Sequence, residues 1–286
     1  MAARQRFVAP EPGEVGADAF MRMPLADWVA AWPALVPSPA WPRIAAFEAA
    51  RHAAQVADGI ARPCFVVQDR ALLEDGLHYE ERVAGGRLAT RLGNWHDLFN
   101  AMAWLRWPRI KHALNEGQCA GIVEIGHGGR TRAQCALTHF DEAGVIVACA
   151  DADLLAAWDV HAWQALFVDH AAAWGERIVA LVFGHALLEH ALLPARLLVG
   201  KALVLQSTPA EVRALAGGAA DARAVLDARV AAIVRGTPAL ADPQQLRPLP
   251  LSGIPGWHAA RQDAAFIAAA PCFQPLRPGR RYPPWH

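Results

Sequence analysis

Asn94-Trp95-His96-Asp97-Leu98-Phe99-Asn100 is the stretch that organises the rest of the chain. Gly93 interrupts an extended segment just before it, and Asp97 follows Asn94 by three residues. This spacing is typical of a helix N-terminus, because a short polar side chain can accept a hydrogen bond from a backbone N–H that has no partner within the helix. The pattern predicts a helix from Asn94 to about Trp107.

Two β-hairpins are expected on either side of this helix. Residues 79–91 alternate in polarity and contain a turn at Ala84-Gly85-Gly86. A second pair of extended runs, 134–140 and 145–150, surrounds the turn Asp141-Glu142-Ala143-Gly144. Glycine-containing turns between extended runs are typical of hairpins, and Asp and Gly each have a local explanation in such a turn.

Most of the remaining sequence favours helices. The expected helices span about 24–33, 43–57, 109–115, 154–174, 178–193 and 219–236. Residues 117–133 are expected to form a glycine-rich loop, and 64–67 a brief strand, whereas 197–205 is too short and apolar to assign. We therefore predict an α+β fold: a mainly helical single domain with two β-hairpins packed on helices. We divide the chain into an N-terminal segment (1–20) that is mobile or lies along the surface, a single domain (21–275) and a tail (276–286). The tail is the last part of an extended Pro-rich C-terminal region.

Composition excludes several classes of protein. Of the 286 residues 54% are hydrophobic and 19% charged, which is enough apolar surface to exclude a disordered chain. Lysine plus arginine and aspartate plus glutamate number 27 each, so no overall field favours nucleic acid as a partner. The N-terminus has no apolar signal segment, and the longest apolar run is too short for a membrane span. We expect a cytoplasmic location and leave the oligomeric state open.

The five cysteines give no sign of a metal or disulfide framework. They are scattered, odd in number and lack a CxxC pair. We interpret them as reduced residues of the core: Cys64, Cys119, Cys135, Cys149 and Cys272.

Two pairs of residues on predicted helices, each a histidine with a polar residue four positions later, are the candidates for catalysis or ligand binding. His96 and Asn100 lie four residues apart on one face, in the first helical turn, where unpaired N–H groups and the helix dipole favour an anion. His185 and Glu189 have the same spacing within apolar sequence, so they could hold one metal or bond to each other. A purely structural role remains open for each pair. The glycine-rich loop lacks a P-loop ending, and no GxSxG or HExxH motif occurs.

The chain resembles the bacterial family catalogued as domain of unknown function 3025, over roughly residues 25–275. The matching strings are Tyr79-Glu80-x-Arg82-Val83, Thr90-Arg91-x-x-Asn94 through Ala101, Trp104, Pro108, Lys111, Leu114-Asn115, Ala136-Leu137-Thr138, Phe140-Asp141-Glu142, Phe183 through Glu189, Leu249-Pro250 and Gly253 through Trp257. The resemblance implies no particular activity. The chain departs from the family pattern at two places. Gln134-Cys135 stands where an Arg-Asp pair is expected, and Ile267-Ala268 stands where acids are expected.

These observations favour a metal-assisted hydrolase or another enzyme acting on a small anionic molecule. The expected catalytic residues are His96, Asp97, His185 and Glu189, and the metal ligands His96, His185 and Glu189, with a divalent metal as cofactor. The expected ligand-binding residues are Arg91, Asn100, Lys111 and Asn115. Two alternatives are a non-catalytic interaction protein with structural polar clusters and a metal-dependent nuclease. A distance from His96 to His185 within about 5–8 Å, with a cleft between them, would favour the enzyme, whereas positions at opposite ends of the molecule would make both structural.

Overall fold

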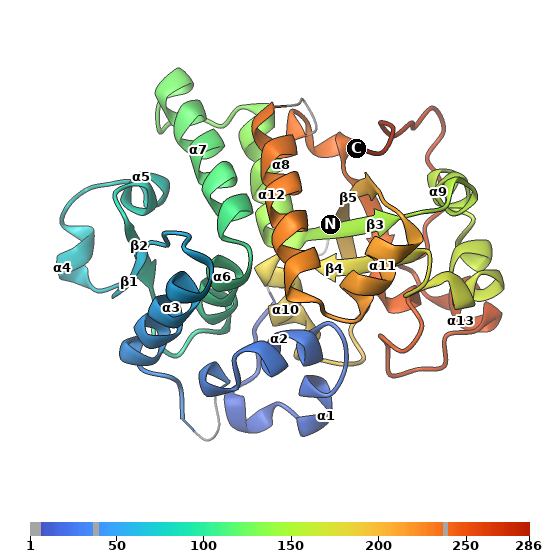
Figure 1. Ribbon diagram of the computed structural model, residues 1–286, viewed down its shortest axis with the longest axis horizontal. Coiled ribbons are helices and arrows are strands. Elements are labelled where there is room, and N and C mark those ends of the chain that lie inside the picture. Colours follow the sequence, from blue (N-terminus) through green and yellow to red (C-terminus); the bar gives the residue numbers. More distant parts are fainter. Residues whose placement is uncertain (1–6, 37–39, 237–239) are drawn as a thin grey trace, which may run out of the picture.

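Two small sheets, separated by helices, form the framework of the protein (Figure 1). The structure is a computed structural model that describes residues 7–36, 40–236 and 240–286. One sheet contains two parallel strands, β1 (Cys64–Val67) and β2 (Arg87–Thr90). In the view of Figure 1 this sheet lies on the left and the larger one on the right. The predicted α+β class is confirmed.

The larger sheet has the strand order β4-β3-β5-β6. Its strands are β3 (Gly144–Cys149), β4 (Ile178–Val182), β5 (Val199–Gln206) and β6 (Arg247–Pro250). Every residue of β3 is buried, because this strand lies between antiparallel β4 and parallel β5. The proline-containing β6 lies at the sheet edge, where a missing N–H costs least.

Helix α6 (Trp95–Arg106) confirms the helix predicted from the opening stretch. The Asn94 side chain accepts a hydrogen bond from the backbone N–H of Asp97 at 3.0 Å, which is the expected cap. Eleven of the helix's twelve residues are buried, and the helix therefore crosses the interior. Trp107 ends it, and Pro108 opens the next helix at once.

Helix α7 (Pro108–Ile125) is much longer than predicted, and the expected loop at 117–125 is wrong. Gly117 and Gly121 lie inside the helix and allow α8 (Arg132–Ala143) to approach. A Cβ at Gly121 would lie only 2.3 Å from Cδ of Gln134. These glycines therefore serve close helix packing rather than a loop.

Neither predicted hairpin forms. The run expected as the first strand of the N-terminal hairpin is helix α5 (Tyr79–Ala84), whose N-terminus is capped by His78. Only β2 is extended, and it pairs in parallel with β1 rather than with a hairpin partner. The six residues that alternate in polarity form about one and a half turns of a half-buried helix instead of a strand.

The second hairpin is replaced by a helix that runs directly into a strand. Thr131 and Gln134 form a capping box, and the helix α8 buries Ala136, Leu137 and Phe140 on one face. Strand β3 begins at the residue that follows α8. Asp141 and Glu142 consequently lie in the last helical turn, and their interpretation as turn residues is wrong.

Two of the long helices expected later in the chain are also wrong. Residues 178–193 divide into β4 and α10 (His185–Ala191), since the β-branched residues at 178, 179 and 182 favour a strand. Residues 154–174 contain α9 (Ala152–Asp159) and short helical turns, with a break at His161, whose φ is 57°. The unassigned segment 197–205 contains most of β5.

Three other helices match the expected ones: α2 (Leu25–Ala31), α3 (Ile44–Asp58) and α12 (Ala220–Gly236). Four more helices were not predicted, the last of them in the segment expected to be extended: α1 (Ala17–Phe20), α4 (Arg70–Leu73), α11 (Pro209–Ala216) and α13 (Ala264–Ala269). None of the helices within the described residues is long and apolar enough to cross a membrane. Of the five cysteines, all free thiols, only Cys149 is buried and Cys64 is exposed, so their general placement in the core is wrong.

Both ends of the described chain contact the body of the protein. Trp95 Nε1 donates a hydrogen bond to the carbonyl oxygen of Pro10 at 2.7 Å. In the tail, His286 exchanges backbone hydrogen bonds with Val204 and Gln206 of β5. Residues 1–6 of the expected mobile segment lie outside the described residues.

Candidate functional site

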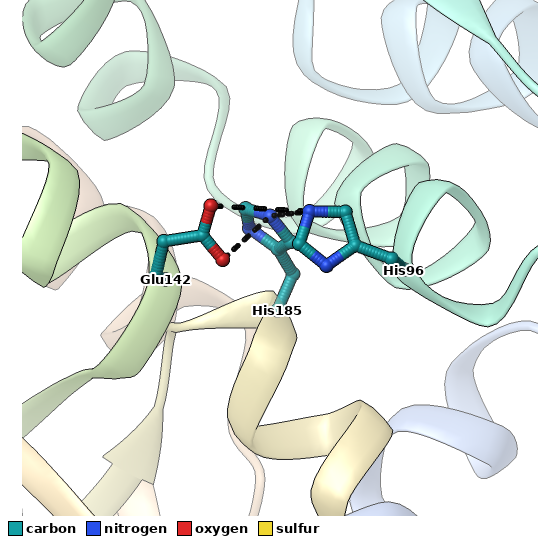
Figure 2. A group of neighbouring side chains, drawn as sticks. All are labelled: His96, Glu142 and His185. Atoms are coloured by element: carbon teal, nitrogen blue, oxygen red, sulfur yellow. Dashed lines mark hydrogen bonds and ion pairs between the residues drawn. The ribbon is translucent and has the colours of Figure 1, made fainter. Parts of the chain in front are cut away.

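His96 and His185 lie side by side although 89 residues separate them in the sequence. Their Nε2 atoms are 3.0 Å apart, and the rings meet edge to face with centroids 4.4 Å apart. His96 lies in the first turn of α6, and His185 is the first residue of α10. Figure 2 shows the two rings directed at one another from these helices.

Glu142, from the last turn of α8, completes the cluster (Figure 2). Its carboxylate oxygens lie 3.9 Å from Nε2 of His96 and 3.5 Å from Nε2 of His185. One nitrogen or oxygen of each residue lies within 4.8 Å of those of the other two. Two imidazoles and one carboxylate therefore converge from three different helices.

A close backbone contact brings His185 beside Glu142. Gly184 precedes α10, and its N–H and that of Phe183 both donate to the carbonyl oxygen of Gly144 at 2.8 and 2.9 Å. A Cβ at Gly184 would lie 2.4 Å from the Gly144 nitrogen and 2.5 Å from the Glu142 carbonyl oxygen. Only glycine permits the start of α10 to approach the end of α8 so closely.

Glu189 contacts the far side of the His96 ring. Its Oε2 lies 3.3 Å from Nδ1 of His96, so it is outside the converging group and orients the imidazole instead. The sequence placed Glu189 with His185 as a metal ligand. The structure instead puts Glu142 next to both histidines and Glu189 behind one of them.

The two histidines differ in their affinity for a proton. Burial lowers the pKa of His185 to about 3. Burial also disfavours the charged form of His96, but the hydrogen bond that its ring donates to Glu189 and the charges of Glu142 and Glu189 outweigh it and raise the pKa. Burial raises the pKa of Glu142, against the effect of His96. His185 is therefore neutral at neutral pH, with a lone pair available.

Lys111 and Asn100, expected to bind a ligand, belong to a buried network beside the cluster. Lys111 Nζ donates to Asp141 Oδ1 at 2.6 Å and to Asn100 Oδ1 at 2.9 Å. The amide of Asn100 in turn donates to the hydroxyl of Tyr79 at 2.8 Å. Burial opposes the charge of Asp141, but Lys111 lowers the pKa below its ordinary value. Two of the three N–H donors of Lys111 are thus bound by protein oxygens.

Asn115 is also committed to a partner within the protein. Its amide donates to Oε2 of Glu80 at 2.7 Å and to the Glu80 carbonyl oxygen at 2.9 Å. Burial raises the pKa of the Glu80 carboxyl. Asn115 lines a small pocket of about 20 Å³ that borders the main cleft, and it does not line the cleft itself.

Arg91 and Asp97 form one ion pair at the edge of the site. The guanidinium of Arg91 makes two hydrogen bonds to Asp97, at 2.7 and 3.0 Å, and its backbone N–H makes a third at 2.6 Å. The Arg91 side chain remains 50% exposed. Asp97 therefore stabilises the segment that leads from β2 into α6, and its carboxylate is not part of the converging group. The Arg91 side chain keeps access to solvent.

A cleft of about 630 Å³ opens over the cluster. Its walls include all three converging residues and the glycine-rich loop at 126–130, and it carries the exposed cations Arg91 and Arg130. This volume falls in the range of small-molecule sites. The sequence-based criterion of two neighbouring histidines beside a cleft is met.

Comparison with known proteins identifies the family. The family model described as "Protein of unknown function (DUF3025)" matches residues 64–277, and the chain belongs to this family. No curated protein and no solved structure matches the chain. The matched region contains every member of the cluster, and Glu142, which periodicity alone assigned to a turn, stands in the string Phe140-Asp141-Glu142 that carried the resemblance.

Proposed function

We propose that the protein is a metal-dependent hydrolase in which His96, His185 and Glu142 bind one divalent metal ion at the base of the cleft. The observation that carries this proposal is the convergence of the three side chains within 4.8 Å. Two neutral imidazoles and one carboxylate are a ligand set of catalytic zinc sites and also of non-haem iron sites.

The spacing of the three donors is compatible with a bound metal ion. A tetrahedral zinc with bonds of about 2.0–2.1 Å holds its ligand atoms about 3.3 Å apart. Here the two Nε2 atoms are 3.0 Å apart, Oε2 of Glu142 lies 3.5 Å from Nε2 of His185, and its Oε1 lies 3.9 Å from Nε2 of His96. One donor atom from each residue lies within 4.8 Å of the other two. Small side-chain rotations would bring all three donors into contact with one ion.

The surroundings of the cluster match those of a metal site. Glu189 behind Nδ1 of His96 forms the carboxylate–histidine arrangement that fixes the tautomer and leaves Nε2 free for a metal. Lys111 neutralises Asp141, the other acid nearby. The ligand set is thereby limited to three residues, and such open sites leave a position for water.

A metal at this position would supply a nucleophile at neutral pH. Zinc in catalytic sites lowers the pKa of its bound water to about 7. The exposed guanidinium of Arg91 and the neighbouring Arg130 would attract an anionic group of the substrate to the same cleft. Hydrolysis of a small anionic substrate is the reaction class that fits these features.

The test is metal analysis of tag-free protein, purified without chelator and then titrated with Zn²⁺, Fe²⁺ and Mn²⁺. We expect about one metal per chain in the wild type and loss of most of it in His96→Ala, His185→Ala and Glu142→Gln. His52→Ala is the matched control, because His52 is exposed on α3 and its loss should leave the metal content unchanged.

Two results would overturn the proposal. One is wild-type protein that binds none of the three metals at micromolar concentration. The other is a metal content that stays the same in all three cluster variants while they remain folded by circular dichroism. Preference for Fe²⁺ over Zn²⁺ would support the metal site and identify iron as the ion that activates the water.

A further inference from the structure

A second, larger hollow lies between the four-stranded sheet and the C-terminal tail. This groove has a volume of about 880 Å³ and shares no lining residue with the cleft at the His cluster. Its walls come from α8, β5, β6 and residues 271–282. We call it the tail groove.

The charge of the tail groove has one sign only. Lys201, Arg277, Arg280 and Arg281 line it, and no aspartate or glutamate of the described ranges does. Within the described residues, Lys201, Arg277 and Arg281 make no ion pair with an acidic side chain. Asp242 interacts with Arg280 electrostatically but is already bound by Arg132 at 2.5 Å. Three of the four cations therefore have no acidic partner among the described residues, and Arg280 shares Asp242 with Arg132.

The wall that carries the arginines is held in place. The Nδ1–H of His161 and the indole N–H of Trp163 both donate to the carbonyl oxygen of Gln274, at 3.0 and 2.8 Å. Nε2 of His161 accepts a hydrogen bond from the hydroxyl of Tyr282 at 3.1 Å. These bonds fasten both ends of the arginine-bearing segment to the body of the protein.

The individual cations are also prearranged. The Arg280 guanidinium lies 4.6 Å from the centre of the Tyr282 ring and donates one hydrogen bond to Gln244 at 3.2 Å. Its other N–H donors have no partner among the described residues. Lys201 is half-buried on β5, and burial together with the charges of Arg280 and Arg277 lowers its pKa. Holding these cations together without an anion is electrostatically unfavourable.

We propose that the tail groove binds the polyphosphate group of a small molecule, with Lys201, Arg277 and Arg280 as its phosphate contacts. Guanidinium and ammonium groups are the usual partners of phosphate oxygens. The volume suits a small molecule. The tail groove would be a second binding site, separate from the proposed metal centre and independent of it.

The test is isothermal titration of the metal-free, full-length protein at low ionic strength with inorganic triphosphate. We expect binding that weakens as salt is added, because phosphate contacts are screened. Lys201→Ala and Arg277→Ala should each reduce the affinity about tenfold, the loss of one charge-assisted contact. Arg277 is exposed, so its substitution leaves the fold intact.

Two controls separate this site from other causes. Arg70→Ala removes the same charge from α4, where the side chain is 96% exposed, and should retain wild-type affinity. Arg130→Ala, which removes an exposed cation of the cleft at the His cluster, should also retain it; a loss of affinity in this variant would place triphosphate in the cleft and reject the tail groove. ATP is titrated in parallel: tighter binding than triphosphate assigns a contribution to the nucleoside, and equal binding assigns recognition to the phosphates alone.

The proposal is overturned if wild-type protein does not bind triphosphate at millimolar concentration. It is equally overturned if Lys201→Ala and Arg277→Ala both bind as the wild type does. Loss of binding in Arg70→Ala to the same extent as in Arg277→Ala would show a non-specific charge effect and would also reject the tail groove.

Discussion

The two glutamates beside His96 have different positions and should have different effects. Glu142 lies on the Nε2 side of the ring together with His185, whereas Glu189 lies 3.3 Å from Nδ1. The first can reach a metal shared with both histidines. The second can act only through the imidazole.

We therefore expect Glu189→Gln to weaken metal affinity by about 10–100-fold, the usual effect of removing an outer carboxylate. Glu142→Gln should have a larger effect, because it removes a ligand. Competition with a chromogenic chelator measures both affinities. Equal effects of the two substitutions would contradict the different positions assigned to these glutamates.

At the scale of the element, the junction between β4 and α10 controls the distance between His185 and Glu142. Gly184 occupies this junction with no room for a side chain, because its surroundings are backbone atoms of residues 142–144. Backbone cannot move aside as a flexible side chain can. The end of α8 and the start of α10 are thus fixed against each other.

Gly184→Ala should destabilise the protein by about 1–3 kcal/mol, the usual cost of overpacking, and should reduce metal content as well. Urea unfolding, with metal analysis on the same sample, measures the two effects. Gly13→Ala is a suitable control, since nothing lies within 4 Å of a Cβ at Gly13. A variant with wild-type stability would contradict the close contact.

Sequence reasoning predicted α6 and its cap because that information is local: Asn94 bonds to Asp97 three residues away. It failed at α8, where a glycine beside acidic residues is as typical of a hairpin turn as of a helix end. What distinguishes the two is the packing of Gly117 and Gly121 against Leu137 and Gln134, a contact between segments that no local pattern reveals.

The candidate site was predicted only in part, because local patterns identify single residues but not contacts between distant segments. His96 and His185 stood out by composition and spacing, and the structure brings them together. Glu142 did not stand out, because its role depends on the antiparallel pairing of β3 with β4. Long-range strand pairing cannot be deduced from a run that looks like a short hairpin.

At the scale of the whole molecule, metal binding should be coupled to stability. The three proposed ligands come from α6, α8 and α10, and an ion held by all of them favours the folded state alone. At 100 times its dissociation constant, such an ion adds about 2.7 kcal/mol.

We expect saturating Zn²⁺ to raise Tm by about 5–10 °C at pH 7, with reversal by a chelator, as measured by differential scanning calorimetry. The increase should disappear towards pH 5, because imidazole must be neutral to bind a metal and the pKa of His96 is raised. Mg²⁺, which prefers oxygen ligands, should have little effect. The same shift in His96→Ala would contradict the coupling.

The pairing of β3 with β4 also has a consequence for how the chain can vary. Val145 lies opposite Val182, so Glu142 and His185 emerge from the same end of this strand pair. Residues 150–177, which connect the other end, do not contribute to the cluster. Insertions and deletions in that connection are therefore compatible with an unchanged geometry of the three ligands. A slip of one residue in the pairing of β3 with β4 would displace His185 by about 3.3 Å and separate it from the other two ligands.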